Sequence, residues 1–448
     1  MHDSALRRAI EAGETSAGPA APARAPRPRV LLVTTLRWPT AALLAAALTD
    51  AGFEVGALCP EHHPLRAVRG LIAAPVYRHL SRHRRLARAI ARVGPDIVVP
   101  CDDLAVTVLH EHHSLCRRAA STKARGALIE ASLGDAVHFA LLRSKSAFVA
   151  FAAANGVHTP KTTVVKNVAD LRGRLDRSTF PVVVKADGWS GGRGTRIVRN
   201  AEEAVVAFET LARPMSWVSA VKDCLREASV APVVQRFGGA SATVTLQALA
   251  PGRPVNRAVV CRDGRVIAGR TFEAVETMPN NGNATVVRPR HIPQVDVAVE
   301  RCVALLGLSG VVGFDFMYDE ATDTALMLEV NPRATSACYT APKGGSDLTL
   351  ALHAALTGVP AACEPAPAGA TLIALFPQEL ERDPHSRYLR DAQQQAPLGH
   401  PDLVQACLLL ATRRSLYERI VGAIKGAGRA AAARVGVQST RLATPEAP

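Results

Sequence analysis

The stretch from Gly313 to Arg333 constrains the fold of this chain more than any other. It holds two apolar, β-prone runs, Gly-Phe-Asp-Phe-Met-Tyr and Ala-Leu-Met-Leu-Glu-Val-Asn-Pro-Arg, separated by the turn-like Asp-Glu-Ala-Thr-Asp. This pattern predicts a β-hairpin. A turn that closes symmetrically would place Asp315 opposite Met327. Glu329 would then be a diagonal neighbour of Asp315 on the same face, with the two Cα atoms roughly 7–8 Å apart.

The polar residues of this hairpin form a candidate metal site. Asp315, Glu329 and Asn331 face the same way and offer two carboxylates and an amide. Such oxygen donors suit Mg²⁺ completed by water and phosphate. The alternative is a hairpin whose polar residues only face water. Asp315 argues against it, because this residue lies in an apolar run and a buried carboxylate needs a partner. Pro332 ends the ladder, and Arg333 follows as a planar cation able to hold phosphate or carboxylate.

The hairpin resembles the metal-binding hairpin of the ATP-grasp superfamily, which includes biotin carboxylase, carbamoyl phosphate synthase and many carboxylate–amine ligases. Lys145 lies one helix upstream of Gly-Val-His-Thr-Pro, where that superfamily carries a lysine that contacts the ATP phosphates. Without the resemblance, Lys145 would be read as a surface lysine. The resemblance covers residues 29 to about 355 and is strongest from 141 to 335.

A second lysine is followed by a glycine-rich loop. Lys185 ends the predicted strand Phe180–Lys185, and the loop after it contains Gly191, Gly192 and Gly194. Glycine lets backbone N–H groups approach phosphate closely. The loop lacks the Gly-Lys-Ser/Thr of a P-loop and the helix that follows a dinucleotide fingerprint. A flexible hairpin with no ligand is an equal alternative from the loop alone, but with Lys185 it resembles the ATP-grasp lid.

Residues 232–245 resemble the hinge strand that lies along the adenine. The resemblance implies that backbone groups pair with the base at Val234, Gln235, Arg236 and Phe237. An acidic residue usually holds the ribose in this superfamily, whereas Ser241 or Thr243 stands in that place here. Further along, Arg270 or Arg288 is a candidate to face an acidic substrate.

The sequence predicts an α/β and α+β chain with three parts. Strands at 29–35, 53–58 and 96–100 alternate with helices at 39–52 and 82–93, a pattern typical of a doubly wound α/β domain. The predicted organisation is a disordered tail at 1–28, this N-terminal domain at 29–140, an ATP-grasp module at 141–360 with its lid lobe at about 160–235, and a small C-terminal extension at 361–448 with a basic helix from about 403 to 435. The resemblance implies that ATP binds between two α+β lobes of the module.

Composition limits the other classes of function. The 448 residues carry a net charge of +14, yet only 4% are aromatic and no nucleic-acid motif occurs, so we do not expect nucleic acid as a partner. The nine cysteines are scattered without a C-x-x-C pair, which favours reduced thiols in the cytoplasm over disulfides or zinc. No window suggests a membrane helix. Adjacent histidines such as His112 and His113 do not form a zincin pattern and favour a core or surface role.

The resemblance implies an ATP- and Mg²⁺- or Mn²⁺-dependent ligase. Asp315, Glu329 and Asn331 would hold the metal, Lys145, Lys185 and the lid would hold the triphosphate, and Arg333 would stabilise charge that develops during catalysis. A small-molecule carboxylate would become an acyl phosphate and then react with an amine. Two alternatives stay open: an ATP-binding protein of the same fold with reduced catalysis, and a basic nucleic-acid-binding scaffold. The implied ligase is compatible with a homo-oligomer.

Overall fold

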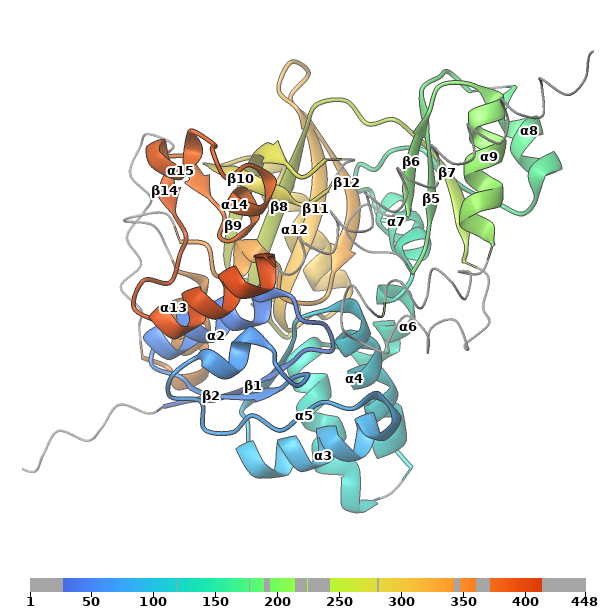
Figure 1. Cartoon of the computed structure of the whole chain (residues 1–448). Helices are drawn as coiled ribbons and strands as arrows, with labels where there is room; N and C mark the ends of the chain where they lie inside the picture. Colours follow the sequence, from blue (N-terminus) through green and yellow to red (C-terminus); the bar gives the residue numbers. More distant parts are fainter. Residues whose placement is uncertain are drawn as a thin grey trace, which may run out of the picture.

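The computed structural model describes residues 27–118, 120–176, 178–188, 194–213, 224, 242–279, 282–341, 347–359 and 371–412. The described chain contains three β-sheets that lie side by side (Figure 1). The predicted mixture of an N-terminal α/β layer and a following α+β module is confirmed.

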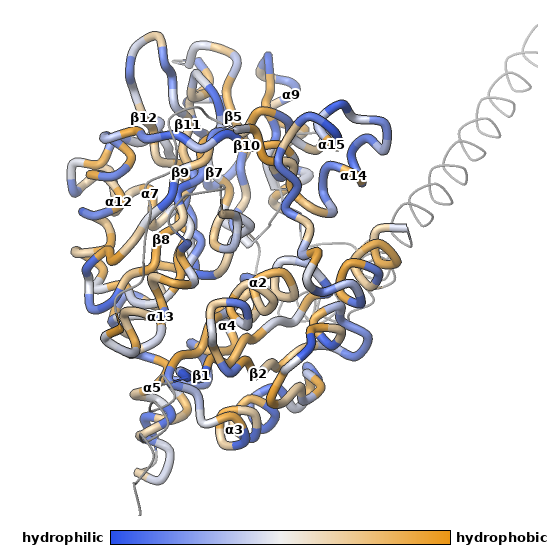
Figure 2. The backbone as a smooth tube through the Cα atoms, turned by 90° about the vertical axis from the view of Figure 1, so that its left-hand side faces the viewer, coloured by the Kyte–Doolittle hydropathy of each residue, from blue (hydrophilic) through white to orange (hydrophobic). Residues whose placement is uncertain are grey.

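The N-terminal sheet is parallel, with the strand order β2-β1-β3. In β1, Val30 and Leu32 pack into one apolar cluster and Leu31 and Val33 into another, so the strand is covered on both faces. Figure 2 shows apolar residues along β1 and β2 between the surrounding helices. The elements of this layer are β1 (Arg29–Val33), α2 (Pro39–Asp50), β2 (Glu54–Leu58), η1 (Pro64–Ala67), η2 (His79–Ser81), α3 (Arg82–Val93), β3 (Ile97–Pro100), α4 (Asp103–Cys116), η3 (Ala120–Thr122), α5 (Lys123–Leu133), η4 (Ala136–His138) and α6 (Phe139–Leu142).

A four-stranded antiparallel sheet follows, with the order β4-β7-β5-β6. Helices α8 and α9 pack on it through one apolar cluster that includes Leu171, Val184 and Phe208. Helix α7 leads into this sheet and lies between it and the next one (Figure 1). The elements are α7 (Lys145–Ala154), β4 (Thr162–Val165), α8 (Val168–Leu175), β5 (Val182–Ala186), β6 (Thr195–Val198), α9 (Ala201–Ala212) and β7 (Val244–Ala248).

The largest sheet has seven strands in the order β12-β11-β8-β9-β10-β13-β14. Strands β8 and β9 form a hairpin that turns at Asp263 and Gly264, which both have positive φ. The elements are β8 (Arg253–Arg262), β9 (Arg265–Thr277), β10 (Ala284–Arg290), α12 (Pro293–Leu305), β11 (Gly310–Asp319), β12 (Thr324–Asn331), η5 (Ser336–Cys338), α13 (Leu348–Thr357), β13 (Ile373–Ala374), α14 (Gln378–Arg382), α15 (Tyr388–Asp391) and β14 (Gln393–Gln394).

The hairpin β11–β12 forms as predicted, but its predicted register is wrong. Near the turn Phe316 pairs with Met327, and a register shift between Asp315 and Phe316 then places Asp315 directly opposite Glu329. In a β-bulge of this kind, two residues of one strand lie opposite a single residue of the partner strand. The two carboxylates are therefore directly opposed, and Glu329 is not the diagonal neighbour that a symmetric turn would give.

One apolar cluster joins the N-terminal sheet to the largest sheet. It contains Leu44 of α2, Val260 of β8, Leu352 of α13 and also Leu403 and Cys407. The last two lie on helix Pro401–Thr412, the described start of the predicted basic helix. This segment thus packs on the body of the protein. We propose to divide the chain at about residues 140 and 360, as the sequence suggests.

No single helix among the described residues is long and apolar enough to cross a membrane, although the bent pair Ala136–Leu142 and Lys145–Ala154 passes the length and composition test when taken together.

Gly134 provides a test of the contact between the N-terminal layer and the largest sheet. It bridges to Leu308 with a φ of +103°, and a Cβ there would overlap the carbonyl oxygen of Gly307. We expect Gly134→Ala to lower the free energy of unfolding by roughly 1–3 kcal/mol, the usual cost of forcing a side chain into such a backbone conformation. In contrast, Gly173→Ala in α8 meets no atom within 4 Å and should be neutral or slightly stabilising. Equal urea midpoints for the two variants would contradict this account.

We expect the protein to lose stability in acid because two of its histidines are buried. Burial, the largest effect, lowers the pKa of His110 to about 3 and that of His112 to about 4. Below pH 6.5 the unfolded chain binds protons that the folded chain does not. The free energy of unfolding therefore decreases as the pH falls from 6.5 towards 4. The loss should reach roughly 2 kcal/mol per histidine by pH 5. In thermal melts, His110→Phe should flatten the pH dependence of the Tm. The control His385→Phe, at an exposed histidine, should leave that pH dependence unaltered.

Candidate active site

The site is built on two opposed carboxylates. Asp315 of β11 faces Glu329 of β12. Asp315 accepts hydrogen bonds from two amides: the Nδ2 of Asn256 lies 2.6 Å from Oδ1, and the Nδ2 of Asn331 lies 2.8 Å from Oδ2. Asn256 comes from β8, the strand that pairs with β11 on its other side. Three neighbouring strands therefore orient one carboxylate.

The two carboxyl groups differ in their electrostatic surroundings. Burial raises the pKa of Asp315, and the facing charge of Glu329 raises it further. Burial also acts to raise the pKa of Glu329, but the charges of Lys145 and Lys185 outweigh it and lower that pKa. The two lysines thus keep Glu329 ionised, whereas the surroundings of Asp315 disfavour its ionised form.

Two lysines reach this pair from different elements. Lys145 is the first residue of α7, and its Nζ lies 2.7 Å from Oε2 of Glu329. Burial opposes the charge of Lys145, yet Glu329 leaves its pKa raised overall. Lys185 comes from β5 in the four-stranded sheet. Burial lowers its pKa, and within the described part of the chain it makes no ion pair. Its charge is therefore available to a further anion.

Asp187 ties α7 to the strand that carries Lys185. It accepts hydrogen bonds from the hydroxyl groups of Ser144 and Ser146, both at 2.8 Å, and from the backbone N–H of Ser146 at 3.2 Å. Ser144 in turn caps the helix by accepting from the N–H of Ala147. This contact fixes the start of α7, and with it Lys145, relative to β5.

Arg333 lies on the other side of the carboxylates. Its Nε is 2.6 Å from Oδ1 of Asp103, and its Nη2 is 3.1 Å from Oδ1 of Asn331. Asp103 begins α4 at the carboxyl end of β3, and the preceding Asp102 caps that helix. Burial would lower the pKa of Arg333, but Asp103, Glu329 and Asp315 leave it raised. The N-terminal layer thus contributes directly to the site.

The donor set was tested for a divalent cation. Among the described residues no group of three or more His, Cys, Asp or Glu is placed to hold a metal. Two opposed carboxylates and the amide oxygen of Asn331 remain, and they are hard oxygen donors of the kind that Mg²⁺ binds together with water and phosphate. Burial and the facing charge of Glu329 raise the pKa of Asp315, and a nearby positive charge would favour its ionised form. The residues present therefore fit such an ion.

Comparison with known proteins places this arrangement in a family. Residues 144–354 match the family described as "Carbamoyl-phosphate synthase L chain, ATP binding domain". An ATP-grasp domain therefore spans residues 144–354 of the chain. Among curated proteins it is similar to the phosphoribosylamine–glycine ligase of Ralstonia nicotianae, with 24% identity over 42% of each chain, and to that of Listeria monocytogenes serotype 4b, with 28% identity over 50% of this chain and 46% of the other. It thus spans less than half the length of these relatives.

Solved structures show the same fold. The biotin carboxylase domain of Hydrogenobacter thermophilus 2-oxoglutarate carboxylase, solved with MgADP, ADP and bicarbonate, has a TM-score of 0.55 and 16% identity, covering 77% of this chain and 73% of that one. The N5-carboxyaminoimidazole synthetase of Staphylococcus aureus, complexed with ADP, has a TM-score of 0.55 and 14% identity, covering 77% and 81%. The ATP-grasp fold predicted from the sequence is confirmed.

The structure gathers six of the sequence-predicted residues of the ATP-grasp site. They are Lys145, Lys185, Asp315, Glu329, Asn331 and Arg333. Gly194 lies just before β6, and its carbonyl accepts from the N–H of Ala186. The other predicted positions lie outside the described residues: Gly191, Gly192, Val234, Gln235, Arg236, Phe237 and Ser241.

The two arginines that are candidates to face an acidic substrate lie in different surroundings. Arg270 is buried and donates to the carbonyl of Thr340 at 2.7 Å, which gives it a role in packing. Arg288 is half-buried on β10, opposite Glu273, and makes no ion pair with any residue that the structure describes. Arg288 therefore stays a candidate for an acidic substrate.

Sequence reasoning missed three residues of the site. Asn256 interrupts an apolar strand, Asp187 follows Lys185 by two positions, and Asp103 lies three positions after the last residue of a parallel strand. Each was visible as a polar residue at the end of an apolar run or within it. Their partners are 59, 41 and 230 positions away in the sequence, so no local pattern could have indicated the contacts.

The Asp187 contact gives a stability test. Removal of its carboxylate in Asp187→Ala leaves Ser144 and Ser146 without their acceptor, and we expect the free energy of unfolding to fall by roughly 1.5–3 kcal/mol, as for hydrogen bonds to a charged group. Asp176→Ala is the matched control, because Asp176 is exposed at the end of α8. Urea unfolding would measure both, and a loss in the control as large as that in Asp187→Ala would refute the assigned role.

Proposed function

We propose that this protein is an ATP- and Mg²⁺-dependent ligase that activates a carboxylate as an acyl phosphate and joins it to an amine. The observation that supports this best is the cluster of Asp315, Glu329 and Asn331 facing Lys145, Lys185 and Arg333 from three separate parts of the fold. Acidic oxygen donors surrounded by cations suit a metal-bound polyphosphate.

Each residue of the cluster has a distinct role in the proposed reaction. Lys145 and Lys185 hold phosphate oxygens of ATP between the small sheet and the large one. Asp315, Glu329 and Asn331 would hold Mg²⁺, which would supply charge neutralisation on the phosphates when bound. Lys145 pairs with Glu329, and this position beside the candidate metal ligands would let it contact a phosphate as well.

The proposed chemistry has two steps. A carboxylate oxygen of the substrate attacks the γ-phosphorus of ATP, the bond to the β-phosphate oxygen breaks, and ADP leaves. The amine nitrogen then attacks the acyl carbon and displaces inorganic phosphate, and its proton passes to solvent. Arg333, held by Asp103, lies where it can stabilise the negative charge that develops. The names of the two curated relatives state the same kind of pair, since glycine carries a carboxylate and phosphoribosylamine an amine.

Two further features support the assignment. The solved neighbours were complexed with ADP, and one also with magnesium. The eight cysteines that the structure describes are free thiols, which suits the reducing cytoplasm that we propose as the location of the enzyme.

The proposal is tested by ADP release with Mg²⁺ and ATP in the presence of pools of amino acids, small carboxylic acids and amines. We expect substrate-dependent ADP release that falls by roughly a hundredfold or more in Glu329→Ala, because the variant removes a group that organises charge in the site. Glu320→Ala is the matched control, since this carboxylate is exposed in the turn of the same hairpin.

Other outcomes separate the alternatives. ATP binding without turnover in any pool would favour an ATP-binding protein with reduced catalysis. Failure to bind ATP would refute the proposal outright. Salt-sensitive binding to DNA or RNA that is indifferent to Glu329→Ala would favour the basic scaffold.

A further inference from the structure

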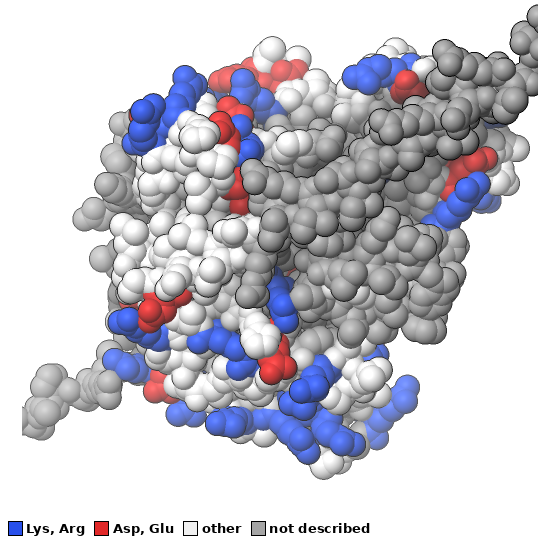
Figure 3. All heavy atoms as spheres, viewed as in Figure 1, with Lys and Arg blue, Asp and Glu red and all other residues white. Residues whose placement is uncertain are grey.

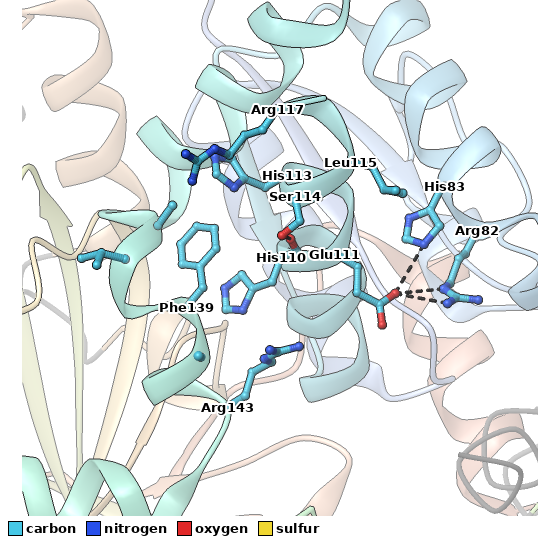
Figure 4. Close-up of a pocket in the computed structure, with 13 residues that line it drawn as sticks. Arg82, His83, His110, Glu111, His113, Ser114, Leu115, Arg117, Phe139 and Arg143 are labelled. Atoms are coloured by element: carbon cyan, nitrogen blue, oxygen red, sulfur yellow. Dashed lines mark hydrogen bonds and ion pairs between the residues drawn. The ribbon is translucent and has the colours of Figure 1, made fainter. Parts of the chain in front are cut away.

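A cavity lies in the N-terminal layer. It has a volume of about 540 Å³ and opens between α4, the start of α3 and the segment from η4 to α6 (Figure 4). Cavities of this size hold small organic molecules in other proteins. None of the residues assigned above to ATP or Mg²⁺ lines it, so a ligand here is independent of the proposed ligase reaction.

The lining of this cavity has an excess of positive charge. Its carboxylate, Glu111, is already engaged by Arg82 at 3.2 Å and by His83 at 3.4 Å. Arg117 and Arg143 also line the cavity, are exposed, and have no ion-pair partner among the described residues. Figure 4 shows them at opposite ends of the group of labelled side chains. Two guanidinium groups are therefore available to a ligand.

A buried histidine without a hydrogen-bond partner lies between these arginines. His110 is only 3% exposed, and neither ring nitrogen has a partner among the described residues. Its ring stacks on Phe139 at a centroid distance of 3.9 Å, and Figure 4 shows it between Phe139 and Arg143. Buried polar groups in proteins are normally satisfied, so an unsatisfied one in a cavity wall indicates a missing partner.

The surface around the cavity would attract anions. Helix α3 has the sequence RHRRLARAIARV, and its first two residues line the cavity. In Figure 3 Lys and Arg side chains gather over the lower part of the molecule, where Figure 1 places α3 and α5. A positive surface beside a cavity raises the local concentration of anionic ligands.

We propose that this cavity binds a small organic anion that carries a carboxylate or a phosphate. Arg117 and Arg143 pair with its acidic groups, and His110 exchanges a hydrogen bond with it. Guanidinium groups suit both kinds of acid, since their planar donors match carboxylate and phosphate alike.

Calorimetric titration of the full chain tests the proposal with two matched pairs of probes. Ribose 5-phosphate and succinate are the anions, and ribose and succinamide are their uncharged counterparts. We expect at least one anion to bind and neither neutral compound to do so. The stronger anion shows which acid the cavity prefers.

Substitutions then locate the binding. Arg117→Gln with Arg143→Gln should raise the Kd by roughly tenfold to a hundredfold, as for loss of hydrogen bonds to charged groups. The double control Arg88→Gln with Arg118→Gln removes the same charge at exposed arginines outside the cavity and should leave the Kd within about twofold of the unaltered chain. His110→Phe keeps the ring that stacks on Phe139 but removes both nitrogens, and it should weaken binding while thermal melts show a folded protein.

A further variant separates this cavity from the proposed ATP site. Lys185→Ala should leave binding of the preferred anion unchanged, although it impairs ADP release. Three results would overturn the proposal: no binding of either anion, equal loss of affinity in both arginine double variants, or loss confined to Lys185→Ala. The last would assign the anion to the ATP site instead.

Discussion

The opposition of Asp315 and Glu329 is the constraint on which the rest of the site depends. Two carboxylates on facing strands repel each other, and partial burial makes the repulsion stronger than in water. Three cations from different elements balance this negative charge: Lys145 from α7, Lys185 from the small sheet and Arg333 from the end of the hairpin. None of these elements could move far without leaving a buried charge uncompensated. The charge pattern therefore links the small sheet, the large sheet and the N-terminal layer.

Further hydrogen bonds and an ion pair hold these charged groups in place. Asn256 and Asn331 occupy both oxygens of Asp315, Asp187 fixes the start of α7, and Asp103 holds Arg333. The arrangement also suggests how ligand binding and structure are coupled. Lys145 pairs with Glu329, so under the proposed function a divalent cation and a polyphosphate would replace this contact with ionic contacts of their own.

Much of the architecture could be predicted from the sequence because it depends on local patterns. The apolar strand predicted at 29–35 and the helix predicted at 82–93 each correspond to an element that the structure contains. The ordered set of Lys145, Lys185, Asp315, Glu329, Asn331 and Arg333 likewise pointed to an ATP-grasp module, and the structure brings these side chains together. The register of β11 and β12 could not be predicted, because a bulge between Asp315 and Phe316 depends on pairing with β8 as well as on the turn.

The sequence by itself determined the fold family and the candidate residues of the site, since hydrophobic periodicity, turn residues and motif order are local properties of the chain. Only the tertiary structure decided the partners of those residues. Asp103 meets Arg333 across 230 positions, and Asn256 meets Asp315 across 59. The same holds for the cavity beside α4, where His110 and Arg143 come together through the packing of α6. Such contacts are set by how layers pack around shared apolar clusters, and this packing is the sum of many weak interactions that no short stretch of sequence encodes.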